Sequence, residues 1–207
     1  MHGDLVLSGV SIRASPSLDI LGVKFDSKLT FEDNVRGIVP RVSQRIGILR
    51  LVRQIFVGTS VFRCCYFAFV LTILEYCSPV WGSAAECHLQ ILEYQVYSVA
   101  RLCNDQSFLS LCHRRRVSGL SMLYKVNSNS NHCLFNELPS GSTRIRHTRA
   151  VAITHPLEFK VSRCRKCQFA RSFLPAQVRL WYDLPYTVFD TLTLDGFKGA
   201  VNAWLLP

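Results

Sequence analysis

The spacing of hydrophobic positions changes near residue 30, from alternation to steps of three and four residues. Residues 5–12 and 18–25 mix β-branched residues with rough alternation, and turn-forming residues separate them. This pattern predicts a β-hairpin. From Thr30 to Phe56 the apolar positions follow one face of a helix, with Thr30 and Asp33 as an approximate capping box. Pro40 interrupts the pattern, so we expect one kinked helix or two.

Further apolar patterns predict helices along the rest of the chain. Residues 62–76 are apolar nearly all round, which is typical of a helix enclosed by its neighbours. An amphipathic helix is expected after the capping box Ser83 to Glu86, and another opens at Ser110 and ends near the polar run 127–131. Periodicity then weakens until a last helix predicted over residues 193–205.

These elements predict a mainly α fold, a helical bundle with an N-terminal β-hairpin and a less regular, basic C-terminal part. We expect three segments: 1–29 for the hairpin, 30–127 for the helical domain, and 128–207 for the basic extension with its terminal helix. The polar run at 127–131 marks the second boundary.

Neither a membrane span nor a secreted, disulfide-bonded fold is expected. Residues 54–74 contain Arg63 as their one charge, but the uninterrupted apolar run after it is shorter than the roughly 18–20 residues that a bilayer requires. The nine cysteines are an odd number and lie mostly in apolar periodic stretches. They indicate reduced cysteine in an intracellular protein, nuclear or cytoplasmic.

Positive charge is concentrated in one part of the chain. The 207 residues carry a net charge of +10, and residues 101–171 hold thirteen basic side chains against three acidic ones. Of the 24 cations 18 are arginine, which pairs bidentately with phosphate. A polyanionic partner is therefore predicted, with nucleic acid favoured over a membrane surface.

The predicted nucleic-acid contacts are cations in two patches. Aromatic residues Phe159, Phe169 and Phe173 lie near the second patch, as expected where rings stack on bases and cations neutralise phosphates. A solvated basic loop is the alternative. In the run of three arginines at 114–116, successive side chains splay by about 100°, so they cannot all face one ligand. The candidates are Arg114, Arg115, Arg144, Arg146, Arg149, Lys160, Arg163, Arg165, Lys166 and Arg171.

Catalytic and metal-binding patterns are weak in this sequence. It contains no nucleophile elbow, phosphate-binding loop or zinc-protease motif, so hydrolase and NTPase functions are not predicted. His147, His155, Cys164 and Cys167 form a conceivable zinc site, but their spacing fits no standard finger. Cysteines placed by chance in a cysteine-rich chain are the favoured interpretation.

Several short segments, in the same order, resemble the region that follows the polymerase palm in reverse transcriptases of non-LTR retrotransposons, the LINE elements, particularly the jockey-like group. Their sequences are LGV at 21–23, DSKLTF at 26–31, ILEYCSPVW at 73–81, LEYQ at 92–95, VAR at 99–101, SLCHRR at 110–115, LYK at 123–125, RSFLP at 171–175, LWYDLP at 180–185 and FK at 197–198. No single segment is specific. The resemblance covers nearly the whole chain.

The resemblance implies the thumb of an RNA-directed DNA polymerase and its C-terminal extension, which in the family help to hold the template and the growing duplex. Partners would be RNA or an RNA–DNA hybrid and an upstream palm domain. Catalysis needs an aromatic-Xaa-Asp-Asp motif that binds divalent ions, Mg²⁺ in that palm. No Asp-Asp pair occurs here. We therefore expect a C-terminal fragment that has no catalytic residue and no cofactor of its own, with the palm upstream of Met1.

A second hypothesis is a remnant of a mobile element without a nucleic-acid role, which is non-functional or contacts only other proteins. Pro40 and the Tyr182-Asp183 pair depart from the pattern of the family and indicate drift in a degenerate copy. In such a remnant the hairpin and residues 62–76 would expose apolar surface that a palm normally covers. Exposed apolar surface therefore discriminates the two hypotheses.

Overall fold

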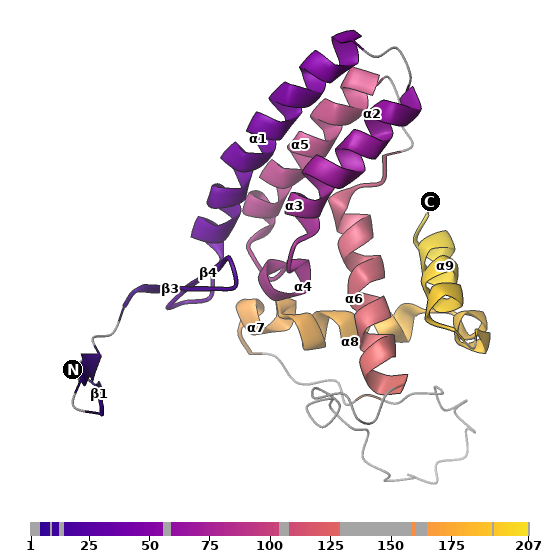
Figure 1. Ribbon diagram of the computed structural model, residues 1–207. Helices are drawn as coiled ribbons and strands as arrows, with labels where there is room; N and C mark the ends of the chain where they lie inside the picture. Colours follow the sequence, from indigo (N-terminus) through magenta and orange to yellow (C-terminus); the bar gives the residue numbers. More distant parts are fainter. Residues whose placement is uncertain are drawn as a thin grey trace, which may run out of the picture.

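The computed structural model describes residues 5–8, 10–12, 15–55, 59–103, 108–128, 159, 165–191 and 193–206. It confirms the mainly α fold with β-structure at the N-terminus (Figure 1). In Figure 1 the helices α1, α5 and α2 stand side by side, α6 continues downward from them, and α7 and α8 run across its lower part. No helix in the described ranges is long and apolar enough to cross a membrane.

The N-terminal strands form two short hairpins instead of the one that was expected. Strand β1 (Leu5–Leu7) pairs with β2 (Val10–Ile12), and β3 (Ser17–Ile20) pairs with β4 (Val23–Asp26), both antiparallel. The second turn has Leu21 at φ 50° and Gly22 at φ 80°. Two successive positive φ values define the tight turn that matches strand twist. Each predicted strand therefore turns back on itself.

Helix α1 (Glu32–Ile55) is a single helix that contains Pro40, so of the two alternatives one helix is observed. At its start the Thr30 hydroxyl accepts a long hydrogen bond from the Glu32 N–H at 3.5 Å, and Asp26 organises the loop before the helix. Asp26 accepts hydrogen bonds from the backbone N–H groups of Lys28, Thr30 and Phe31 at 2.7–3.0 Å and from the Thr30 hydroxyl. Desolvation raises the pKa of Asp26, but these bonds together outweigh it and lower that pKa below 3.8.

The apolar stretch at 62–76 is helical but only one of its faces is buried. It comprises α2 (Thr59–Tyr66), a π-helical turn η1 (Phe67–Leu71) and α3 (Thr72–Glu75). Tyr66, Val70 and Leu74 are buried, whereas Phe67 and Phe69 are exposed. The expectation of a helix enclosed on all sides is thus wrong for these two rings.

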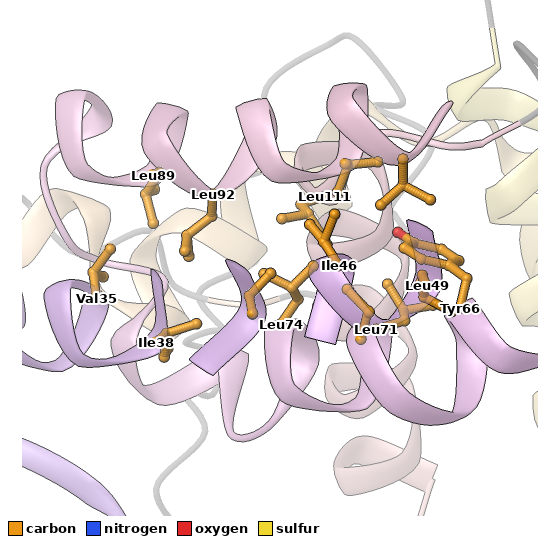
Figure 2. Packing of buried hydrophobic residues seen from close by; sticks show 14 of the residues in the cluster. Val35, Ile38, Ile46, Leu49, Tyr66, Leu71, Leu74, Leu89, Leu92 and Leu111 are labelled. Carbon is orange, nitrogen blue, oxygen red and sulfur yellow. The ribbon is translucent and has the colours of Figure 1, made fainter. Parts of the chain in front are cut away.

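A first cluster of buried side chains joins α1, α2, α3 and α5 (Glu86–Cys103) (Figure 2). Its helices contribute residues at three- and four-residue steps, as the amphipathic patterns require. The short helix α4 (Ser78–Trp81) adds Trp81, which is fully buried and whose indole N–H donates to the Tyr76 carbonyl at 2.7 Å. The first turn of α6 (Leu111–Ser128) closes this cluster with Leu111.

A second cluster lies on the later part of α6. It includes Leu120 from α6, Trp181 from α8 (Phe173–Asp183) and Phe197 from α9 (Leu194–Leu205). Tyr124 stacks on Phe197 with ring centroids 4.3 Å apart. The short helices α7 (Cys167–Arg171) and η3 (Tyr186–Asp190) flank α8. The two clusters therefore divide inside α6, upstream of the boundary expected at 127–128.

Candidate nucleic-acid interface

The N-terminus of α6 is fixed by an acid from α5. Glu93 accepts hydrogen bonds from the backbone N–H groups of Leu111 at 2.9 Å and Cys112 at 2.6 Å. Ser110 accepts a third from the His113 N–H at 3.1 Å, as expected of an N-cap residue. The carboxylate thus satisfies N–H groups that a helix leaves without partners in its first turn, where the helix dipole also favours negative charge.

Two of the predicted phosphate contacts are held in ion pairs within the protein. Arg114 pairs with Glu75 of α3 through Nε, and its Nη2 donates to the second carboxylate oxygen at 3.3 Å. Arg115 Nη2 lies 3.4 Å from Glu93, and its side chain is 14% exposed. Both arginines therefore help to fix α6 against the first cluster, a role that the sequence does not reveal.

Buried Tyr66 lies within the electrostatic reach of these ion pairs. Desolvation raises the pKa of its hydroxyl far above the ordinary value, Arg114 opposes this effect, and Glu75 and Glu93 add to it. Tyr66 is therefore a neutral packing residue at any physiological pH. Its ring packs edge-on against Phe108 with centroids 4.9 Å apart.

Four arginines line one pocket, which we call the arginine pocket. It has a volume of about 410 Å³ and lies between α4, the start of α5, α6, α7 and α8. The cations are Arg115, Arg116, Arg171 and Arg179. Arg116, Arg171 and Arg179 are exposed. Side chains that are more than 50 residues apart in sequence thus share one concave surface, which is an arrangement suited to a polyanion.

Other lining residues shape the arginine pocket. The Arg115 side chain runs beside Gly82, where an added Cβ would lie 4.0 Å from its Cδ. Gln177 packs so closely on Gly119 that an added Cβ would lie 2.5 Å from its carboxamide carbon. Arg115 Nη1 and Gln177 Oε1 are both buried and find no hydrogen-bond partner among the described residues. Among the described residues, exposed Glu86 is the acid that lines the same pocket.

Half of the predicted cations lie outside the described residues: Arg144, Arg146, Arg149, Lys160 and Arg163. Of those described, Arg171 lines the arginine pocket with Arg115, whereas Lys166 lines a neighbouring pocket. Arg165 is exposed and lines neither of these two pockets. The structure therefore brings together two members of the predicted set and adds cations that were not in it.

The zinc hypothesis falls largely on residues that the structure does not describe. His147, His155 and Cys164 are outside the described ranges, and Cys167 is an exposed free cysteine. Within the described ranges, no group of three or more histidine, cysteine or acidic residues is placed to bind a metal ion.

Arg116 and Arg179 are the cations that the sequence reasoning missed. Of the run 114–116, two members were selected as phosphate ligands, yet Arg116 is the exposed one. The acids Glu75 and Glu93 decide this, and sequence alone does not place them beside α6. Arg179 lies beyond the basic stretch, on the helix α8 that packs against α6. The sequence signal that could have indicated Arg116 and Arg179 is helical spacing, which places each cation beside the apolar face of its helix.

Helix α1 carries a second set of cations, which does not converge. After Asp33 it holds five arginines and no acid, and Arg36 is paired with Glu32 at 2.6 Å. At about 100° per residue, Arg41 and Arg50 project from opposite sides of the helix. We interpret these side chains as the solvated surface of a helix.

Comparisons of the chain with protein-family models, curated proteins and solved structures found no match. The resemblance to reverse transcriptases therefore remains a prediction from the sequence.

Proposed function

We propose that the chain binds nucleic acid, RNA or an RNA–DNA hybrid, through its phosphate backbone at the arginine pocket. The observation that carries this proposal is the convergence of four arginines from α6, α7 and α8 on one pocket, with Glu86 as the opposing acid. Arginine forks match phosphate geometry, and backbone contacts of this kind do not depend on sequence.

We further propose, from the sequence resemblance, that this binding serves the template-primer of a retrotransposon RNA-directed DNA polymerase. The chain would act as the thumb and post-polymerase region beside a palm domain that supplies catalysis and Mg²⁺. It would be inactive alone, because its sequence has no paired-Asp motif. An intracellular location, nuclear or cytoplasmic, is consistent with the free state of Cys64, Cys65, Cys77, Cys87, Cys112 and Cys167.

The test compares two triple variants that lose the same charge. R116Q/R171Q/R179Q removes the exposed cations of the arginine pocket, and R41Q/R45Q/R50Q removes three exposed cations from α1. Binding of a labelled single-stranded RNA and of an RNA–DNA hybrid is measured by fluorescence anisotropy between 50 and 200 mM salt.

The pocket variant should lose on the order of tenfold in affinity at low salt, with a salt slope about 2 smaller for single strands, because each phosphate contact contributes about 0.7 to that slope. The α1 variant should bind nearly as the unchanged chain does. Equal losses in both variants, or binding that does not depend on salt, would contradict the proposal.

A second candidate function is docking of another protein on the β3–β4 hairpin. Leu18, Leu21 and Leu29 on and beside this hairpin are 60%, 83% and 51% exposed. Such a group of apolar side chains favours a protein contact. Light scattering and hydrophobic-dye binding on the purified chain test this candidate. A monodisperse, dye-silent monomer argues against it.

A further inference from the structure

A second pocket adjoins the arginine pocket and has the opposite character; we call it the aromatic pocket. Its volume is about 480 Å³, within the roughly 300–1,000 Å³ typical of small-molecule sites. Its lining is mostly apolar and includes Phe31, Val80, Met122, Phe169 and Phe173. Lys166 is the one charged residue among the described residues that line it.

The two pockets are neighbours on the surface. Pro79, Ser83 and Phe173 line both of them, so one layer of residues borders both pockets. Concentrated positive charge therefore lies directly beside a mostly apolar recess. A nucleotide has the same two parts, a charged phosphate and a flat base, which are joined through one sugar.

Phe169 is the residue most suited to a base in this recess. Its side chain is 51% exposed and belongs to neither cluster of buried residues. The neighbouring Gln168 carboxamide donates to the carbonyls of Lys28 and of Leu29, the latter at 2.7 Å, and so ties α7 to the loop before α1. The ring is thus carried by an anchored segment, as a stacking platform requires.

We propose that the two pockets together bind one unpaired nucleotide, with its phosphate in the arginine pocket and its base in the aromatic pocket against Phe169. This inference rests on the proposed function and narrows its ligand to single-stranded nucleic acid. A paired base stays inside its duplex, and extruding it costs free energy, so a duplex end or an overhang is preferred over a continuous duplex.

The test uses the full chain and two short probes with the same phosphates, a 5′-phosphorylated trithymidylate and its abasic counterpart. Stacking of one base predicts a preference for the thymidine probe of about 5- to 150-fold. F169A and F169L, which lose the ring, should remove the preference and leave the affinity for the abasic probe unchanged. Y94A, which removes an exposed aromatic ring from α5, is the matched control and should keep the preference.

The outcomes separate the two proposals. If both probes bind equally and with the same salt dependence, the phosphate site stands and the base site is refuted. If neither probe binds but the labelled RNA does, the nucleotide site is refuted and the phosphate-backbone proposal stands; if the RNA also fails to bind, both are refuted. A preference that survives in F169A and F169L would also overturn the assignment of the base to this pocket.

Discussion

Replacement of Glu93 should lower the free energy of unfolding more than replacement of any other exposed or half-buried acid that the structure describes. The carboxylate accepts hydrogen bonds from two backbone N–H groups of α6, and its Oε1 lies 3.4 Å from Arg115 Nη2. The side chains of Glu93 and Arg115 are 15% and 14% exposed. Alanine would leave two helix donors and a nearly buried guanidinium without their acceptor. Breaking a buried pair on one side costs about 3–5 kcal/mol.

The conservative variant E93Q separates charge from hydrogen bonding. Glutamine keeps one acceptor oxygen but loses the negative charge, so we expect a loss of about 1.5–3 kcal/mol in the free energy of unfolding. For a chain of this length each kcal/mol corresponds to roughly 2–4 °C in Tm, so E93A should lower Tm by about 6–20 °C.

The assay is urea denaturation of the full chain, followed by circular dichroism. E86Q is the control, since Glu86 is an exposed acid in the first turn of the same helix, where loss of its charge should cost at most about 1 kcal/mol. A double-mutant cycle of E93Q with R115Q should give a coupling of about 0.5–3 kcal/mol. If E93A and E86Q shift the midpoint equally, the anchoring role of Glu93 is refuted.

Three further predictions concern the arginine pocket, the loop before α1 and the second cluster. E86Q should raise the affinity for single-stranded RNA about 2- to 5-fold at low salt, because it removes the acid that lines the arginine pocket; unchanged anisotropy titrations would contradict this. D26N should cost about 1 kcal/mol at pH 7. Because the pKa of Asp26 is lowered in the folded state, its contribution is complete above about pH 5 and is lost as pH falls below 3.8 towards the folded value. The gap in unfolding free energy between D26N and the unchanged chain should therefore narrow in urea titrations as pH falls below 3.8. L120A should lose about 2–5 kcal/mol, since Leu120 is fully buried in the second cluster, and a loss under 1 kcal/mol in denaturant would refute that packing.

Helical periodicity was sufficient to predict most of the fold. The steps of three and four residues located α1 and α5, and Ser110, where a helix was predicted to open, is the N-cap of α6. Thr193, predicted as the first residue of the last helix, is its N-cap. The strand pairing was not predictable from alternation alone. Positive φ at Leu21 and Gly22 makes a tight turn inside what reads as one strand, and leucine is not a residue that signals such a turn.

The candidate site was only partly predictable, because pairing between distant side chains decides which cations are exposed. A run of three arginines looks uniform in sequence, yet Glu75 and Glu93 pair with the first two and leave Arg116 exposed. Local charge density therefore does not show which arginines of the run are held in ion pairs within the protein. Arg179 required knowledge of how α8 packs on α6.

The division of the two hydrophobic clusters inside α6 has a mechanical consequence. Leu111 belongs to the first cluster and Leu120 to the second, so the 18-residue helix α6 connects the two clusters without an intervening hinge. Any tilt of α6 would move α8 and α9 with it, because both helices pack against α6. Insertion of one residue between 116 and 117 would rotate the half of α6 that carries the second cluster by about 100°. Arg116 would then be misaligned with Arg179 of α8, while each cluster stayed packed.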